Sequence, residues 1–211
     1  KHLCYRWERG KLLHIHLGLY GKFHSLRLPV PPPRGQVRLR VIGAAEAFDL
    51  VGPNQCELIS ARQWTAIRNR LGADPLRADA DPEIAWQQIH RSRAAIGTLL
   101  LNHSVIAGVG HVYRSEVLHL LGIHPERKGN SLSRDDFDQL WNTLVRLLQI
   151  GVRYNQIIIA EPAKVGKSRS RMSRQERLLV YKRALCLHCE QPVESWTLGA
   201  RKVFACPQCQ T

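Results

Sequence analysis

The chain has 211 residues, 44% of them hydrophobic, which suits one large globular domain or two small ones and excludes a disordered polymer. No apolar run reaches the ~18 residues that a membrane-spanning helix needs, so we expect no membrane span. No secretory signal pattern is visible, so the sequence gives no indication of export.

Positive charge is the strongest bulk feature of the chain. Lys and Arg total 31 against 17 Asp and Glu, which gives a formal net charge of +14 and a pI near 10.1. Such a charge attracts polyanions, and nucleic acid is the commonest of them. An acidic protein or an anionic membrane surface would also attract a chain of this charge. The composition therefore favours nucleic acid as the partner but does not exclude the other two.

The first ~60 residues have the two-residue periodicity of strands. Apolar and polar residues alternate over 12–17 and over 36–42, where Val37, Leu39 and Val41 share one face. The proline-rich stretch 29–35 lies between them and must be a loop. We therefore predict a sandwich-like sheet region within an α+β fold.

From ~60 to ~160 the pattern becomes helical, after a linker marked by Gly72, Pro75 and Pro82. Ser133 followed by Asp136 is typical of a helix start with a capping box. An apolar stripe follows at helical spacing, and we interpret it as core. Its members are Phe137, Leu140, Trp141, Leu144, Val145 and Leu148. The predicted helices span 93–102, 111–121 and 131–153.

Residues 164–183 hold eight Lys or Arg against one Glu, together with Gly166 and several serines. This composition predicts a mobile basic loop that could meet a polyanion. A plain solvated surface loop is the alternative.

Two C-x2-C pairs stand in the last 26 residues, Cys186 with Cys189 and Cys206 with Cys209. Four thiolates fill the tetrahedral shell of one Zn²⁺ and leave no open position, which predicts a structural ion rather than a catalytic one. An iron or iron–sulfur centre is the alternative, and disulfides are disfavoured. We interpret His188, inside the first pair, as a bystander. Two further thiols, Cys4 and Cys56, are predicted to be buried small apolar residues.

The sixteen residues between the two cysteine pairs predict a β-hairpin finger. Residues 193–198 and 202–205 resemble two strands, and Gly199 and Ala200 provide the turn. Arg201 follows that turn, where a guanidinium can bind a phosphate with two parallel hydrogen bonds. A solvated surface arginine is an equally good interpretation of its position alone.

Gly108 and Gly110 directly precede the helix predicted at 111–121. Glycines let a backbone approach its neighbours closely, and the free N–H groups of a helix start bind anions. In a chain with this positive charge, a DNA phosphate is the expected ligand of such a site. A G-x-G pair alone is a weak signal and is usually a tight turn.

Residues 105–118 resemble the helix–two-turn–helix motif of formamidopyrimidine-DNA glycosylases and endonuclease VIII proteins. The end of the chain, 201–210, resembles the arginine, short strand and C-P-x-C-Q that close that family's finger. Residues 1–3 with 14–21 resemble the end of its N-terminal sandwich, and 69–76 resemble its interdomain connector. The likeness covers essentially the whole chain, in order.

The resemblance implies three domains: a partial N-terminal β-sandwich (1–60), a linker with the helix–two-turn–helix domain (61–163), and a basic loop with the zinc finger (164–211). It also implies a bifunctional glycosylase/AP lyase that flips a damaged base out of duplex DNA. In the family an N-terminal proline amine forms a Schiff base with the sugar, and a glutamate beside it moves protons. The strand is then cut by β- and δ-elimination. Endonuclease VIII likeness implies oxidised pyrimidines as substrates, and a monomer in the bacterial cytoplasm near the nucleoid.

The resemblance also implies roles for individual residues. Lys1 matches a lysine implicated in phosphate contact and β-elimination, although a surface lysine is the plain alternative. Arg201 matches the finger arginine that grips phosphate and is assigned to δ-elimination. Residues 18–20 (Gly18, Leu19 and Tyr20) match the loop that fills the gap left by the flipped base. Other matched DNA-contacting positions are His16, Arg70, Gly110 and His111.

This sequence departs from the family pattern in two ways. The proline–glutamate start is absent, and Lys1 cannot replace it, so we expect an incomplete start and no Schiff base from residues 1–211. His111 and His103 stand where asparagine and glutamine are usual. Histidine becomes cationic near its pKa of ~6.5, so we expect DNA binding with unusual pH dependence.

Two other functions compete with the enzyme. A non-catalytic module could hold damaged DNA with the same architecture, and His111 and the absent start favour it slightly. A ribosomal or transcription zinc ribbon would bind RNA or polymerase, but it leaves Arg201 and the 18–20 loop unexplained.

Overall fold

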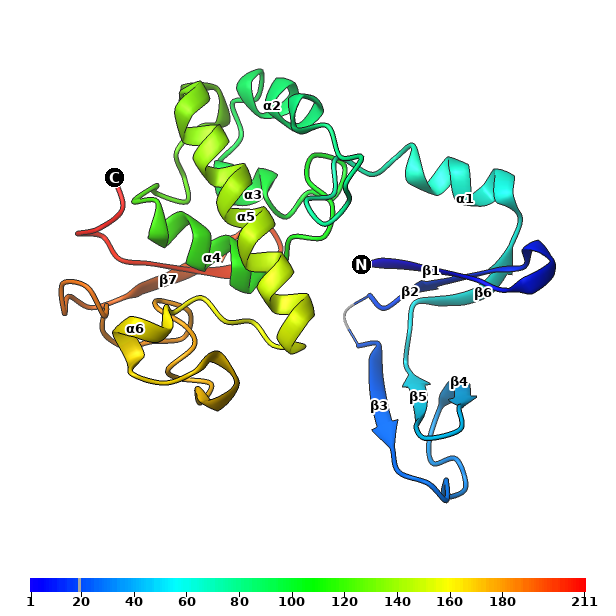
Figure 1. Ribbon diagram of the computed structural model, residues 1–211. Coiled ribbons are helices and arrows are strands. Elements are labelled where there is room, and N and C mark those ends of the chain that lie inside the picture. The colour runs from blue at the N-terminus through cyan, green and yellow to red at the C-terminus, as the bar shows by residue number, and fades with distance from the viewer. Residues whose placement is uncertain (19) are drawn as a thin grey trace. The chain divides into compact units, whose positions relative to one another are not determined.

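A computed structural model describes residues 1–18 and 20–211 of the chain (Figure 1). Two compact units make it up, residues 1–70 and 71–211. The first is built mostly of strands, and the second of helices with one hairpin, so the predicted α+β class is confirmed. Among the described residues, no helix combines the length and the apolar character that a membrane crossing requires.

The first unit contains two antiparallel three-stranded sheets, which are small and open. Their strand orders are β1-β2-β6 and β3-β5-β4. A 3-10 turn, η1 (Glu8–Gly10), joins β1 to β2, and helix α1 (Ala61–Arg68) follows β6. The strands are β1 (His2–Arg6), β2 (Leu12–His16), β3 (Lys22–Leu26), β4 (Val37–Ile42), β5 (Ala47–Val51) and β6 (Gln55–Ile59).

Alternation along these strands builds the small core of the first unit. Leu13 and Ile15 on β2 are buried with Leu50 on β5, because alternate side chains of a strand point to the same face. The strands predicted at 12–17 and 36–42 are confirmed as β2 and β4, and the proline-rich stretch between them is a loop. Cys4 and Cys56 are half-buried rather than fully buried, so the prediction for these thiols was only partly right.

The second unit is organised around its longest helix, α5 (Arg134–Tyr154). Ser133 and Asp136 form the predicted capping box, and the apolar stripe packs into the main core, with Val145 partly buried. The other helical segments are α2 (Pro82–His90), α3 (Ile96–Leu99), α4 (His111–Leu120), η2 (Gly129–Ser131), α6 (Pro162–Val165) and η3 (Arg169–Arg171).

The helix predicted over 93–102 is wrong in its extent. Only Ile96–Leu99 is helical, because the surrounding chain takes over the backbone hydrogen bonds that would start a longer helix. The N–H of Ile96 donates to Arg127 O at 2.8 Å, and that of Gly97 to Pro125 O at 2.9 Å. A Cβ on Gly97 would lie 2.9 Å from the same Pro125 oxygen, so glycine permits this close approach.

The basic segment 164–183 contains short helical turns, part of α6 and η3, where the sequence indicated only a loop. Ion pairs hold it, among them Arg169 with Glu161 at 2.7 Å and Lys167 with Glu176 at 2.5 Å. The mobility expected of this segment stays a prediction.

Gly151 lets α5 approach α4 closely, which gives a testable consequence for stability. A Cβ at this position would lie 2.1 Å from the hydroxyl oxygen of Tyr113, which is buried and donates to Leu147 O at 3.4 Å. Gly-to-Ala changes in a helix usually stabilise it by up to about 1 kcal/mol. Here we expect Gly151→Ala to destabilise the protein by about 1–3 kcal/mol in urea unfolding, because the side chain that would have to shift is buried in the core.

The Tyr113→Phe background isolates the cause. Phenylalanine lacks the oxygen that the added methyl group would meet, so Gly151→Ala should cost clearly less stability there than in the wild type. Equal costs in both backgrounds would contradict the steric explanation.

Candidate metal centre and nucleic-acid interface

Four cysteines converge at the C-terminal end of the second unit. The sulfurs of Cys186, Cys189, Cys206 and Cys209 all lie within 4.8 Å of one another, and this group could hold a metal ion. Separations include 3.4 Å from Cys189 to Cys206 and 3.8 Å from Cys186 to Cys209. Burial, together with the neighbouring thiols, raises the pKa of Cys209 far above its usual range. Four thiolates at such distances repel one another, so the group needs a bound cation to ionise.

The cysteine pairs flank the predicted hairpin. Its strands are β7 (Glu194–Leu198) and β8 (Arg201–Ala205), with the turn at Gly199 and Ala200 as expected. The N–H of His188 donates to the sulfur of Cys186 at 3.4 Å, as in a tight knuckle around a metal. Among the described residues, the candidate ligand group contains no histidine.

Buried Arg114 on α4 anchors this hairpin, and the sequence analysis did not identify it. Its guanidinium donates to the carbonyls of Leu198 at 3.0 Å, Arg201 at 3.1 Å and Lys202 at 2.8 Å. A fourth bond reaches Gly97 O on α3 at 3.3 Å. Burial lowers the pKa of Arg114 to about 10, so the group stays cationic at neutral pH. One side chain therefore joins α4 to three other elements of the second unit, α3, β7 and β8.

Two further contacts fix the finger to the helices. Ser115 Oγ on α4 accepts from the N–H of Phe204 at 3.2 Å. Gln210 accepts from the N–H of Cys206 and donates to the carbonyl of Ile123, both at 2.9 Å. The thiol cluster is thus held at a defined place beside α4.

Helix α4 begins directly after the two glycines, as predicted. Gly108 has a φ of +85°, which L side chains rarely adopt, whereas Gly110 is extended and serves as the N-cap without a side-chain cap. A Cβ on Gly110 would meet nothing within 4 Å apart from its chain neighbours, so the space beside this N-cap residue is open. Such a terminus presents backbone N–H groups and the positive end of the helix dipole.

His111 and Tyr181 meet at this helix start. The ring Nε2 of His111 lies 3.0 Å from the hydroxyl oxygen of Tyr181. Burial lowers the pKa of His111, and the charges of Arg201, Arg114 and Lys182 lower it further. Arg114, in the first turns of the same helix, donates to Arg201 O at 3.1 Å, so the backbone of the finger arginine lies near the start of α4. Cationic groups therefore surround a neutral imidazole at an open helix terminus.

Glu116 holds Tyr181 in this position. Its buried carboxylate accepts from the backbone N–H groups of Leu179 at 2.8 Å, Val180 at 3.1 Å and Tyr181 at 2.8 Å. Burial raises the pKa of Glu116, and these three hydrogen bonds oppose that shift. Neither residue was among the predicted site residues. Only the place of Glu116 inside the 105–118 motif could have suggested it, and no sequence signal indicated Tyr181.

Several predicted DNA-contacting residues belong to the first unit. His16 ends β2 and stacks on His2 with ring centroids 4.3 Å apart. Gly18 has a φ of +63° and lies so close to the Asn54 side chain that a Cβ would be 2.3 Å from its amide oxygen. Tyr20 is 78% exposed, as a wedge residue would be. Leu19 lies outside the described residues.

The remaining predicted residues are exposed at the ends of elements. Lys1 precedes β1, and Arg70 ends the first unit; both are exposed. Arg201, the first residue of β8, is also exposed. The structure therefore brings together Gly110, His111 and Arg201 within the second unit, while Lys1, His16, Gly18, Tyr20 and Arg70 belong to the first.

Comparison with known proteins identifies the family. Residues 71–162 match the formamidopyrimidine-DNA glycosylase H2TH domain. Over its whole length the chain is 42% identical to Endonuclease 8 1 of Mycobacterium tuberculosis and covers 81% of that protein. The chain belongs to the formamidopyrimidine-DNA glycosylase/endonuclease VIII family. The resemblance seen in the sequence is thereby confirmed.

More distant members of the family agree with this assignment. The formamidopyrimidine-DNA glycosylase of Thermomicrobium roseum is 28% identical, and the match covers the whole chain and 78% of that protein. A crystal structure of the Lactococcus lactis enzyme with DNA containing an abasic site is 25% identical and superposes with a TM-score of 0.80. That match covers 100% of this chain and 79% of the Lactococcus chain, so the fold is that of the family.

Proposed function

We propose that this protein is a base-excision repair DNA glycosylase with AP lyase activity that removes oxidised pyrimidines from duplex DNA. Relatives named as endonuclease 8 and as formamidopyrimidine-DNA glycosylase support the glycosylase part. The Lactococcus structure with abasic-site DNA supports damaged duplex DNA as the partner. The net charge of +14 suits a polyanionic substrate.

One observation carries the proposal: the start of α4, surrounded by cations, lies beside the hairpin that the four clustered thiols flank. The N-terminus of α4 and the hydrogen-bonded pair of His111 and Tyr181 offer donors to one phosphate; in the neutral pair one group donates to the other, so the pair has one donor left for the phosphate. The exposed guanidinium of Arg201 adds a bidentate contact from the finger. The helix start and Arg201 would together bind phosphates of the DNA backbone, and these contacts do not depend on the base sequence.

The chemical roles follow from the family. Arg201 binds the phosphate that leaves during δ-elimination, and Lys1 supports β-elimination beside the sugar. Tyr20, whose ring is exposed, enters the stack where the damaged base has been flipped out. His16, Gly18 and Arg70 are proposed to contact DNA near this loop. The pyrimidine preference rests on the likeness of the 18–20 loop to endonuclease VIII.

The metal in this proposal is one structural Zn²⁺. Four thiolates suit zinc, and the closed shell leaves no position for water or substrate. When bound, zinc would neutralise the thiolates and stiffen the hairpin that carries Arg201. It would take no part in the bond-breaking steps.

Covalent trapping tests the enzyme. We expect the full-length gene product to form a borohydride-stable adduct with duplex DNA that contains an abasic site. Cleavage of thymine-glycol DNA with a 3′-phosphate product would establish the lyase and the pyrimidine preference. Tight binding to abasic-site DNA without adduct or cleavage would instead indicate the non-catalytic module.

His111 gives the DNA affinity a defined pH dependence. In the free protein its pKa lies below the ordinary 6.5, because of burial and the cations around it. A bound phosphate would raise that pKa, so DNA binding takes up a proton and the affinity rises as the pH falls below about 7. We expect a gain of up to about tenfold between pH 7.5 and 5.5, since one pKa unit corresponds to a factor of ten. Fluorescence anisotropy with labelled duplex measures it.

His111→Asn should flatten this profile, because asparagine donates a hydrogen bond without titrating. His90, an exposed histidine on α2, provides the matched control, and His90→Asn should keep the wild-type slope. A slope that survives in His111→Asn would show that other groups carry the pH dependence.

A further inference from the structure

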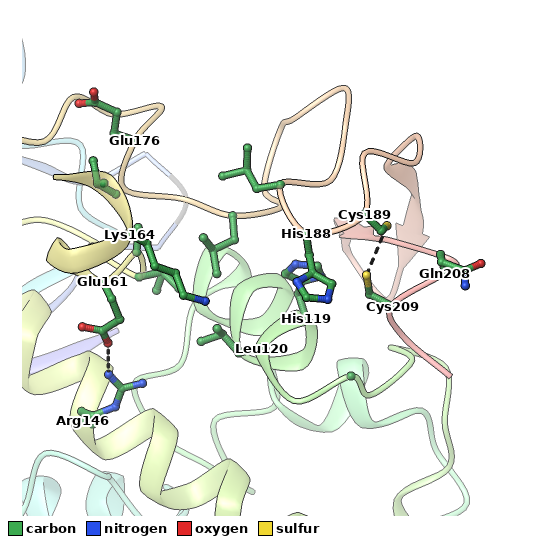
Figure 2. Close-up of a pocket in the computed structure, with 16 residues that line it drawn as sticks. His119, Leu120, Arg146, Glu161, Lys164, Glu176, His188, Cys189, Gln208 and Cys209 are labelled. Atoms are coloured by element: carbon green, nitrogen blue, oxygen red, sulfur yellow. Dashed lines mark hydrogen bonds and ion pairs between the residues drawn. The ribbon is translucent and has the colours of Figure 1, made fainter.

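A cavity of about 860 Å³ lies at the end of α4 opposite to the DNA-contacting start (Figure 2). It runs between α6 and the cysteine knuckle and passes the last residues of α4. Its volume is in the range of ligand-binding clefts, and it is partly open to solvent along its length. Such a trough suits an extended chain better than a compact small molecule.

Apolar side chains give the cavity its floor and one rim. Ile159 and Ala160 are buried beneath it, while Leu120 and Leu187 are 40% and 56% exposed. Leu187 stands in the knuckle between Cys186 and His188, so its backbone is held by the thiol cluster. Exposed leucines on a rigid frame that line one cavity are typical of a surface that binds a partner.

The charged residues that line the cavity are two cations, Arg146 and Lys164, and two carboxylates, Glu161 and Glu176, and both carboxylates are paired. Glu161 is held by Arg146 at 2.6 Å and by Arg169 at 2.7 Å, and Glu176 by Lys167 at 2.5 Å. Lys164 on α6 makes no side-chain hydrogen bond or ion pair with any residue that the structure describes. In Figure 2 its side chain extends from α6 toward the region of His119 and Leu120. Two further cations, Lys167 and Arg169, lie at the cavity through their ion pairs with Glu176 and Glu161, so four cations stand against two carboxylates there.

The cavity is separate from the proposed DNA contact. Gly110 and His111 stand at the first turn of α4, whereas Leu120 is its last residue and Gly122 follows it, about 15 Å away along a ten-residue helix. A DNA backbone presents phosphates and sugars, and no apolar side chain that could pack between two leucines. Both sites could therefore be occupied at once.

We propose that this cavity docks an acidic peptide segment of a partner protein, with an apolar side chain set against Leu120 and Leu187 and a carboxylate on Lys164. The apolar floor requires an aliphatic or aromatic anchor, and the surrounding cations require acidic neighbours. Nucleic acid supplies only the charge, and a basic partner is repelled. The inference does not depend on the glycosylase activity.

Fluorescence anisotropy of the full chain, with zinc bound, tests this. The probe is a short labelled peptide rich in aspartate that ends in Leu-Phe. We expect a Kd on the order of 10 µM, as for other weak docking segments. Lys164→Glu and Leu187→Ser should each weaken it at least about tenfold, and so should Ser-Ser in place of Leu-Phe. Leu120→Ser, away from the thiol ligands, repeats the apolar test if Leu187→Ser loses metal.

Matched controls make the outcome decisive. Lys11→Glu and Ile84→Ser change an exposed lysine and an exposed isoleucine outside the cavity, and both should leave the affinity unchanged. Saturating duplex DNA should also leave it unchanged. The proposal is overturned if the wild type fails to bind, if the cavity variants bind as well as the controls, if DNA displaces the peptide, or if sedimentation shows a second copy of the chain on this surface.

Discussion

Replacement of Arg114 by leucine should detach the finger hairpin from the helices and destabilise the second unit by about 3–5 kcal/mol, as expected when a buried polar network loses its charged member. The carbonyls of Leu198, Arg201 and Lys202 would lose the guanidinium that bonds them. Leucine fills much of the volume but supplies no donor. Because the same carbonyls fix the backbone of Arg201, DNA affinity should fall as well, even in the fraction that stays folded.

Urea unfolding followed by tryptophan fluorescence measures the stability, and anisotropy with labelled duplex measures the binding. Arg114→Lys keeps the positive charge but loses the planar guanidinium that donates several hydrogen bonds at once. This variant should therefore recover little of the stability or the DNA affinity. Arg134→Leu is the matched control: this exposed arginine pairs with Glu83 and Asp138, and surface pairs contribute only up to about 1 kcal/mol. If Arg114→Leu proves as mild as the control, the proposed anchor is wrong.

Loss of one cysteine of the cluster should have the other large effect. Cys189→Ala leaves three thiols, and we expect the protein to lose its bound metal and the finger to lose its fold. Structural zinc contributes roughly 10–16 kcal/mol of apparent binding free energy in small finger peptides, so nothing else in the hairpin can replace it. Affinity for duplex DNA should fall at least about a hundredfold, since Arg201 is then no longer held near α4.

Metal content by elemental analysis, with DNA binding measured in parallel, checks this expectation. Cys56→Ala is the control, because Cys56 lies in the sheet of the first unit and is not among the clustered thiols. Wild-type protein treated with a chelator should behave like Cys189→Ala. A variant that keeps one metal ion per chain and normal DNA affinity would contradict the assignment.

The same cluster predicts how metal retention depends on pH. A thiol must lose its proton before it can ligate a metal, and burial beside the other thiols raises the pKa of Cys209. Protons therefore compete with the metal, and retention should weaken as the pH falls. This loss concerns the finger, whereas the protonation of His111 strengthens DNA binding over the same range. Elemental analysis at each pH separates the two effects.

Local patterns in the sequence were enough to predict the features that depend on neighbouring residues. The two C-x2-C pairs indicated the thiol cluster, because a knuckle brings its own two sulfurs together wherever it lies. The capping pair Ser133 and Asp136 and the stripe after it indicated α5, because helix caps and periodicity act within a few residues. Family motifs then indicated His111, Arg201 and the overall fold.

Contacts between residues far apart in the chain were decided only by the tertiary structure. Arg114 meets carbonyls more than eighty residues away, and Glu116 meets the backbone of 179–181, so no local pattern indicates either role. The helix predicted at 93–102 failed for the same reason, since carbonyls of Pro125 and Arg127 satisfy its backbone instead. The sequence alone determined the metal-binding thiols and the residues expected to contact DNA, because short-range spacing reveals them. Packing decided which side chains support those residues, because a buried polar group must find its hydrogen-bond partner wherever the fold supplies one.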